Sequence, residues 1–297
     1  MTQSNRHADM LARVLHGTRS FKGKARLADF LGRIARFSSG SQGAFPLADG
    51  KTATIDLGDR IQRLMWGAAY EPHIRRCVIA LLRPGDTFVD VGAHIGFFSL
   101  IAASVVGETG KVYAFEANSS LFRKLQAGAA PYPWMVPSPQ AVWNESGTVY
   151  FSDPHRIGES GWGKVTAKRN GEQAAAVPSV SLDDWYEGVG APPIRLIKID
   201  AEGSEPFILE GARRLIASAQ PFMIIELNEE LLRKSGQSNR MVVDGLCARG
   251  YRIFRMGVKR LEECGGASDP LSPEVLCVPE SRWEEAQSAL HPSRTKR

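Results

Sequence analysis

The sequence predicts an α/β fold built on a parallel sheet, because strand patterns alternate with helix patterns along its central part. Residues 87–91 form a short apolar run typical of a buried strand, and residues 97–106 form an apolar helical segment. Residues 111–115 and 119–127 repeat this pair, and residues 194–199 are a third strand of the same kind. Strands that alternate with helices favour a parallel sheet with right-handed crossovers.

The remaining segments are predicted from the same patterns. Helices are expected at residues 70–82, 205–217 and 240–249, and strands at 141–142, 148–151, 222–227, 251–254 and 275–278, with short strand-like pieces between 45 and 65. Residues 153–177 are polar and glycine-rich without a period, which predicts a loop or a lid. We expect this loop and residues 255–272 to set substrate choice, because variable loops commonly do so.

Length and composition indicate an ordinary globular chain. The 297 residues are 43% hydrophobic and 23% charged, which excludes a largely disordered or collagenous protein. The sequence has no apolar run with the pattern of a signal peptide or the length of a membrane span. Four cysteines without a CxxC pair predict neither a zinc ribbon nor a dense disulfide framework. We therefore expect a cytoplasmic protein.

Positive charge is concentrated near the start of the sequence. The net charge is +5, and residues 1–40 alone carry eight basic and two acidic side chains, a local charge of +6. Apolar residues at helical spacing in this segment predict one or two amphipathic helices with basic outer faces. We expect them to dock on the main domain or on a second subunit, and contact with a membrane surface is an alternative that the sequence does not favour. The rest of the chain is nearly neutral, which argues against nucleic-acid binding.

Two glycines mark a turn suited to binding a ligand. In VDVGAHIGFFSL, residues 89–100, Gly92 and Gly96 stand where a strand gives way to a helix. Glycine lets the backbone approach a ligand, and a helix N-terminus offers free N–H groups to polar atoms. The middle glycine of the GxGxxG pattern is absent, so the turn favours a cofactor without a pyrophosphate. A glycine turn that binds nothing is the structural alternative.

Two carboxylates narrow the choice of cofactor. Glu116 ends the second strand, where a bidentate carboxylate suits the two hydroxyls of an adenosine ribose. Asp90 precedes the turn, and its charge would repel pyrophosphate but attract the ammonium of an amino-acid group. S-adenosylmethionine contains both groups, so we expect it as the cofactor. Ser138 and Gln140 follow the next strand and are candidates for adenine contacts, and His94 is expected at the methionyl or acceptor end.

Five segments share the order and spacing of a known family. They are VDVGAHIGFFSL, KVYAFEANSSLF, SLDDW, LIKIDAEGSEPFILEGA and IIELN, and the similarity around them spans about residues 70 to 279. In these segments the sequence resembles the FkbM-type S-adenosylmethionine-dependent methyltransferases. The resemblance implies a class I methyltransferase (Rossmann-like) fold, whose seven-stranded, mostly parallel sheet has an antiparallel last strand. It also implies methylation of an oxygen on a sugar or secondary metabolite. His94 and Ala117 stand where the family more often has Asn and Pro.

Given this resemblance, we predict three parts along the chain. Residues 1–43 form the basic helical extension and linker, residues 44–281 the methyltransferase domain, and residues 282–297 a charged tail. A homo-oligomer is compatible with this organisation.

The chemistry of methyl transfer suggests catalytic residues. Transfer from a sulfonium is an in-line displacement, so the acceptor oxygen must be aligned, and a general base assists. Asp200 and Glu202 follow a strand at the sheet edge where ligands bind, and Lys198 shares the side of Asp200. We assign these three residues to catalysis and expect Asp200 also to contact the cofactor.

Structural roles are the alternative for several of these residues. In this alternative, Lys198 serves merely to pair with Asp200, and Glu205 serves merely to stabilise the start of a helix. Glu226 ends another strand, and its orientation is left open. Clustered carboxylates could hold a divalent ion, but without histidine or cysteine partners we assign no metal.

The sequence therefore predicts an O-methyltransferase that acts on a small hydroxylated acceptor, a carbohydrate or secondary metabolite. A methyltransferase-like scaffold without turnover is the alternative. A nicotinamide-dependent oxidoreductase is disfavoured, because its pyrophosphate glycine pattern is absent.

Overall fold

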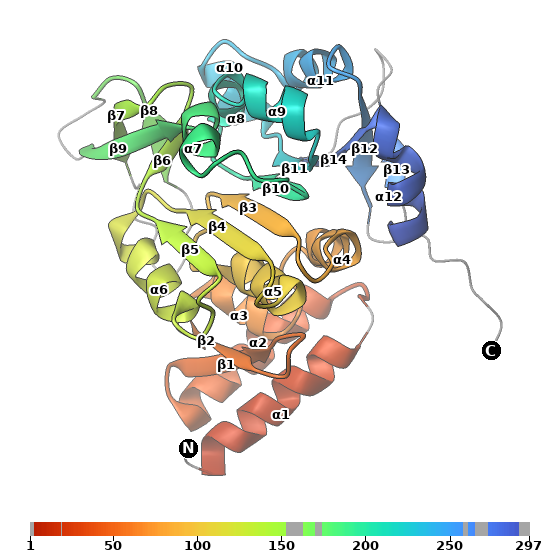
Figure 1. Ribbon diagram of the computed structural model, residues 1–297. Helices are drawn as coiled ribbons and strands as arrows, with labels where there is room; N and C mark the ends of the chain where they lie inside the picture. Colours follow the sequence, from red (N-terminus) through yellow and green to blue (C-terminus); the bar gives the residue numbers. More distant parts are fainter. Residues whose placement is uncertain are drawn as a thin grey trace. The chain divides into compact units, whose positions relative to one another are not determined.

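The computed structural model describes residues 3–18, 20–152, 163–169, 174–257, 261–264 and 273–290 (Figure 1). The described chain divides into two compact units, the first ending at Arg75 and the second beginning at Arg76. The first unit therefore extends past residue 43, where we had placed the end of the helical extension. The functional boundaries at 43 and 281 remain predictions.

The first unit combines helices with one β-hairpin. Its elements are α1 (Gln3–Gly17), α2 (Lys24–Ser39), β1 (Gln42–Pro46), β2 (Thr52–Asp56) and α3 (Arg60–Trp66). The two N-terminal helices confirm the amphipathic prediction for this segment, and β1 and β2 pair antiparallel. Helix α3 corrects the expectation of strand pieces up to about residue 65. The Asp59 side chain accepts a hydrogen bond from the Gln62 N–H at 3.0 Å, which caps the start of α3.

The second unit is built on an eight-stranded sheet in the order β13-β12-β14-β11-β10-β3-β4-β5. Its strands are β3 (Thr87–Val91), β4 (Lys111–Phe115), β5 (Met135–Ser138), β10 (Leu196–Ile199), β11 (Phe222–Glu226), β12 (Tyr251–Met256), β13 (Leu261–Glu263) and β14 (Glu274–Pro279). The strands from β5 to β11 are parallel, and β14 is antiparallel to both of its neighbours. The antiparallel last strand is as predicted.

The eighth strand, β13, corrects the predicted number of seven. It pairs antiparallel with β12, and Arg252 forms hydrogen bonds of 2.8 and 2.6 Å with the Glu263 carboxylate across the pair. Three residues with two charges show no hydrophobic alternation, so the pattern of the sequence does not predict this strand.

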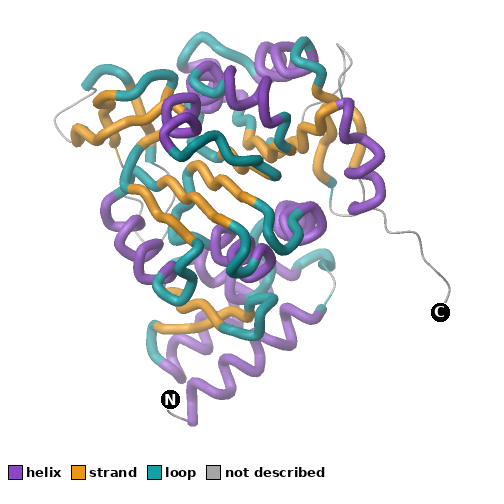
Figure 2. The backbone as a smooth tube through the Cα atoms, in the orientation of Figure 1, coloured by secondary structure: helices purple, strands orange, loops and turns teal. Residues whose placement is uncertain are grey.

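Helices lie on both sides of this sheet (Figures 1 and 2). They are α4 (Pro72–Leu81), which contains the unit boundary, α5 (Phe97–Val106), α6 (Ser119–Ala129), α7 (Leu182–Gly188), α8 (Glu205–Glu210), α9 (Arg213–Ala219), α10 (Glu229–Lys234), α11 (Asn239–Cys247) and α12 (Trp283–Leu290), which follows the 3-10 turn Glu280–Arg282. Figure 1 shows α7 to α9 on one side of β3 and β10, and α5 and α6 on the other.

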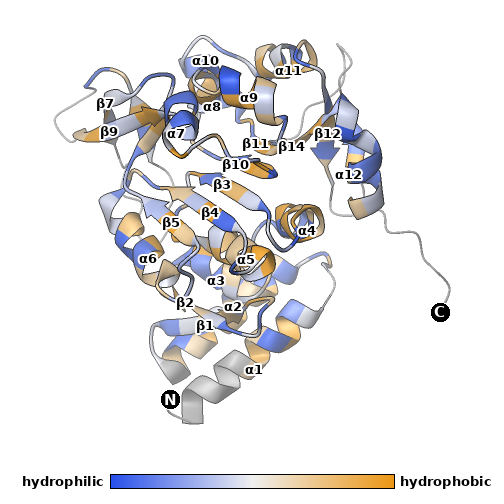
Figure 3. Ribbon diagram, in the orientation of Figure 1, coloured by the Kyte–Doolittle hydropathy of each residue, from blue (hydrophilic) through white to orange (hydrophobic). Residues whose placement is uncertain are grey.

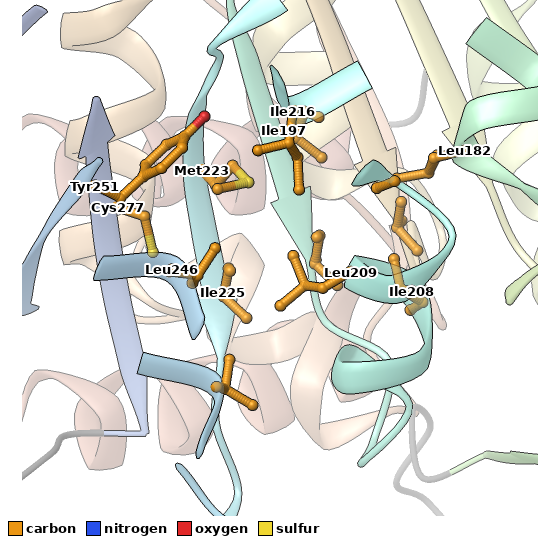
Figure 4. Close-up of a cluster of buried hydrophobic side chains, with 14 of the residues drawn as sticks. Leu182, Ile197, Ile208, Leu209, Ile216, Met223, Ile225, Leu246, Tyr251 and Cys277 are labelled. Atoms are coloured by element: carbon orange, nitrogen blue, oxygen red, sulfur yellow. The ribbon is translucent and has the colours of Figure 1, made fainter. Parts of the chain in front are cut away.

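The core of the second unit packs helices α7 to α11 against one face of the sheet. Figure 4 shows Leu209 and Ile216 from these helices facing Ile197 and Ile225 of β10 and β11. Figure 3 shows hydrophobic colouring on β10 and on the helices α4 and α5. Because strand residues alternate between faces, the neighbouring residues Lys198 and Glu226 belong to the opposite side, on which α5 lies.

A separate four-stranded sheet in the order β6-β9-β7-β8 corrects the predicted loop at 153–177. Its strands are β6 (Ala141–Trp143), β7 (Gly147–Ser152), β8 (Lys164–Thr166) and β9 (Ala175–Ser181). Residues 153–162 and 170–173 of the predicted loop lie outside the described residues, as do 258–260 and 265–272 of the second predicted loop and 291–297 of the predicted tail. Strand β8 and the first residues of β9 therefore fall in the segment without hydrophobic period. A small sheet with one buried face needs few apolar residues, so its strands leave a weak pattern in the sequence.

The helix predicted at 205–217 is two helices, α8 and α9, separated at Gly211. A Cβ atom at Gly211 would lie 2.5 Å from the carbonyl oxygen of Trp143. The close approach of the strand β6 explains why glycine stands at this position. Among the described helices, none combines the length and apolar character needed to cross a membrane.

Candidate active site

Four neighbouring parallel strands bring the predicted residues to one edge of the sheet. Their pairing register places Phe115, Val91, Ile199 and Ile225 in one row across β4, β3, β10 and β11. The residues that directly follow this row are Glu116, Gly92, Asp200 and Glu226. Ligands of open parallel sheets bind at this carboxyl edge. The structure thus brings together residues that lie up to 134 positions apart in the chain.

The glycine turn is shaped by a close contact with the end of β10. Gly92 has φ 75°, and a Cβ atom there would lie 1.8 Å from the carbonyl oxygen of Asp200. The N–H groups of Gly92 and Ala93 both donate to the carbonyl of Phe115, at 3.0 and 2.9 Å. Packing alone therefore requires glycine at position 92, whether or not a ligand binds.

The other two turn residues also have positive φ angles. Gly96 has φ 86° at the start of α5, and a Cβ atom there would lie 2.7 Å from Leu125 Cδ1. His94 has φ 56°, in the left-handed region that His and Asn adopt more readily than most residues. This backbone requirement gives a physical reason why His can stand where the family more often has Asn.

Glu116 is buried and already bonded to the turn. Its Oε2 accepts a hydrogen bond from the His94 N–H and its Oε1 from the Asn118 N–H, both at 2.8 Å. Burial raises the pKa of Glu116 to about 7. Each carboxylate oxygen has two acceptor sites, so Glu116 retains capacity for two further donors.

Asp90 lies within β3 and beside Lys198 of β10 in the strand register. Its Oδ2 accepts a hydrogen bond from the Ser99 hydroxyl of α5 at 2.5 Å. Its Oδ1 is buried without a hydrogen-bond partner among the described residues. Burial raises the pKa of Asp90 above its ordinary value, although the charge of Lys198 opposes this. Such an unpartnered buried oxygen is costly and is often completed by a ligand or a water.

Lys198, Asp200 and Glu226 form a compact charged group. Lys198 Nζ donates to Asp200 Oδ2 at 2.6 Å and lies 5.2 Å from the centre of the Phe98 ring. The negative charge of Asp200 and burial raise the pKa of Glu226 to about 11, so Glu226 is a neutral hydrogen-bond donor to Asp200. Burial acts to raise the pKa of Asp200, but the Lys198 charge and hydrogen bonds from both neighbours outweigh burial and hold this pKa low.

Three further predicted residues lie around this group. Glu202 is half-buried in the turn after β10 and has φ 50°. His94 lies close enough to Asp200 for its charge to lower the pKa of that carboxyl. On the other side, Gln140 accepts a hydrogen bond of 2.9 Å from the Ser138 hydroxyl, and the Ser138 carbonyl accepts from the Glu116 N–H at 3.1 Å. Gln140 is therefore next to the strand end that carries Glu116.

Two residues of this site, Glu226 and Ser99, were not assigned to it from the sequence. Glu226 was not assigned to the site, because alternation alone did not decide its orientation. Ser99 had no sequence signal, because its contact with Asp90 depends on how α5 packs on the sheet. Among the described residues, no group of three or more His, Cys, Asp or Glu side chains is arranged to hold a metal ion.

Glu205 stabilises the turn that carries Glu202. The Glu205 side chain is buried, and its Oε1 accepts hydrogen bonds from the N–H groups of Ala201 at 3.0 Å and Gly203 at 3.2 Å. Burial raises the pKa of Glu205 from 4.5 to about 7. This contact gives Glu205 a structural role beyond favouring the start of α8.

We expect Glu205→Gln to flatten the pH dependence of stability. Between pH 4.5 and 7 the folded protein keeps a proton on Glu205 that the unfolded chain has released. Stability from this group is therefore fully present below pH 4.5 and is lost as the pH rises through 7, by about 3 kcal/mol. Urea unfolding measures the fall in the free energy of unfolding between pH 5 and pH 8. This fall should be smaller by about 2 kcal/mol in the variant than in the wild type. Glu210→Gln, an exposed change on the same helix, is the control, and parallel wild-type and Glu205→Gln profiles would contradict this role.

The second unit has the class I methyltransferase fold, with its parallel strands and antiparallel last strand. The sequence model described as "Methyltransferase FkbM domain" matches residues 90–253, more than half of the chain. The chain therefore belongs to the FkbM methyltransferase family.

Individual relatives are distant. The curated hexuronic acid methyltransferase AglP of Haloferax volcanii is 26% identical over 159 residues, which are 53% of this chain and 62% of that protein. The structure of an FkbM methyltransferase from Methylobacillus flagellatus is 15% identical, covers 73% of this chain and 54% of that chain, and has a TM-score of 0.42. An O-methyltransferase from Bacillus cereus, in complex with SAH, is 10% identical over 92% of this chain and 99% of that chain, with a TM-score of 0.41. This chain thus covers less than two thirds of the first two relatives.

Proposed function

We propose that this protein is an S-adenosylmethionine-dependent O-methyltransferase whose acceptor is a sugar hydroxyl. The observation that carries the proposal is the row of Glu116, Gly92, Asp200 and Glu226 at one sheet edge. The family supports methyl transfer as the reaction. The name of AglP supports a hexuronic acid as the first acceptor to test.

The residues at this edge fit the cofactor. Glu116 has free acceptor sites for the two ribose hydroxyls, and Gln140 lies beside it for the adenine. The unpartnered Oδ1 of Asp90 offers a hydrogen-bond acceptor, and the ionised Asp200 supplies negative charge that suits a cationic ligand. The cofactor supplies an electrophilic methyl group on a sulfonium.

Asp200 is the residue we assign as general base. Its carboxylate is ionised at neutral pH, so it can accept the proton of an acceptor hydroxyl without first losing one of its own. Lys198 and Glu226 each hold Asp200 by a hydrogen bond, which fixes its orientation and charge. Glu202 and His94 lie near this group, and we assign them to contacts with the acceptor. Lys198 thus acts through Asp200 and is a positioning residue.

The test is methyl transfer from radiolabelled S-adenosylmethionine to a panel of glucuronic and galacturonic acid glycosides, with neutral hexosides beside them. The proposal predicts labelled O-methyl sugar, identified by mass spectrometry. Cofactor binding without transfer to any sugar or small hydroxylated metabolite would instead favour the scaffold alternative. The cytoplasmic location remains a prediction from the sequence.

A further inference from the structure

Helix α2 presents a continuous apolar stripe to solvent. Leu27, Phe30, Ile34 and Phe37 are spaced by three or four residues, which places them along one face of the helix. Phe30 is 60% exposed and Phe37 is 92% exposed. Of the eleven large apolar side chains exposed among the described residues, seven lie between Met10 and Phe37. Exposed apolar patches of this kind mark interaction sites.

Packing among the described residues of the first unit does not account for this stripe. A different face of α2, made of Ala28, Gly32 and Ala35, is buried. Gly32 lies against the Arg63 side chain, and Ala28 lies so close to Gly67 that a Cβ on that glycine would be 2.2 Å away. The small-residue face therefore docks α2 on the end of α3. The apolar stripe is not part of this contact.

Arginines flank the stripe on the side away from the buried face. At 100° per residue, Arg26 and Arg33 fall next to the stripe and Arg36 falls between Arg33 and the buried face, and all three are exposed. Asp29, the sole acidic residue of α2, pairs with Arg33 at 3.0 Å and with Arg63 at 2.7 Å. Among the described residues, neither Arg26 nor Arg36 has an ion-pair partner.

This arrangement has the chemistry of a helix that lies in a lipid interface. Such helices combine an apolar face of Leu and Phe with Lys and Arg beside it, and they bind anionic lipids by burial and charge together. A second copy of this chain is less suited, because it would bring two arginine-rich faces together without free carboxylates. We propose that the apolar stripe of α2 and its arginines bind the surface of an anionic lipid bilayer. This reverses the preference drawn from the sequence.

Vesicle sedimentation of the full chain tests the proposal. Wild-type protein should sediment with vesicles of phosphatidylglycerol and phosphatidylcholine, bind pure phosphatidylcholine weakly, and lose affinity as salt is raised. Phe30→Ser/Phe37→Ser should weaken binding about tenfold or more, because two apolar side chains no longer enter the interface. Arg26→Gln/Arg36→Gln should weaken binding to anionic vesicles and reduce its salt dependence.

The control is Met241→Ser, which removes an exposed apolar side chain from α11 and should leave binding unchanged. Thermal unfolding of each variant checks that it folds, and the arginine variant provides the test if the phenylalanine variant does not. Absence of wild-type binding to anionic vesicles would overturn the proposal. So would a wild-type dimer in light scattering that Phe30→Ser/Phe37→Ser converts to a monomer without any change in vesicle binding.

Discussion

Replacing Gly92 with alanine is expected to lower the free energy of unfolding by about 4 kcal/mol. The new Cβ atom would lie 1.8 Å from the Asp200 carbonyl oxygen. The backbone fixes the positions of both atoms, so no change of side-chain rotamer relieves the clash. The φ angle of 75° adds strain of its own. The clash must separate the turn from the end of β10. We therefore also expect loss of cofactor binding in whatever variant protein still folds.

Gly236→Ala is the matched control for this substitution. Gly236 has φ 74°, but no heavy atom lies within 4 Å of the position that a Cβ would take. In the control, the free energy of unfolding should fall by only about 1 kcal/mol, the strain of a non-glycine residue in the left-handed region. Urea unfolding of both variants measures the difference. Equal losses in the two variants would show that the contact between the turn and β10 does not constrain position 92.

Replacing Asp200 with asparagine is expected to lower kcat for methyl transfer by about 10²- to 10⁴-fold. The amide cannot take the proton of the acceptor hydroxyl. It also removes the charge that pairs with Lys198 Nζ at 2.6 Å and that keeps Glu226 protonated. The measurement is kcat at saturating cofactor and acceptor, together with its pH profile between pH 5 and 9.

Asp244→Asn is the control for this second prediction, because Asp244 is an exposed carboxylate of α11 that pairs with Arg240. It should keep wild-type kcat. Calorimetric titration with S-adenosylhomocysteine and thermal unfolding separate a chemical defect from lost binding or lost folding. If folded Asp200→Asn protein keeps kcat within about twofold, Asp200 is not the base.

The parts of the fold that the sequence predicted best are those with strong local patterns. Strands β3 and β4 and helix α5 have the predicted bounds, because fully apolar runs between turn residues leave little choice of element. The alternation of strands and helices along the chain was enough to predict a mostly parallel sheet. Strand β13 and the four-stranded sheet depend on pairing between different segments of the chain. The local hydrophobic pattern of the sequence does not predict such pairing.

The candidate site was predictable where residues follow strand ends, as Glu116 and Asp200 do. What each residue contacts could not be predicted in the same way. Asp90 meets the Ser99 hydroxyl through the packing of α5, and Glu226 meets Asp200 through the register of β10 and β11. The need for glycine at position 92 comes from the close approach of the Asp200 carbonyl, a contact between residues 108 positions apart.

Calorimetric titration with S-adenosylhomocysteine is the most direct test of the proposed cofactor site. At pH 8 we predict binding of one molecule per chain, no binding of NAD, and clear weakening in Glu116→Gln. Because the pKa of Glu116 is about 7, the wild type should bind about tenfold more weakly at pH 6, where the carboxyl is protonated, and the variant should lack this dependence. Failure of the folded wild type to bind S-adenosylhomocysteine, or unchanged affinity in Glu116→Gln, would contradict the account.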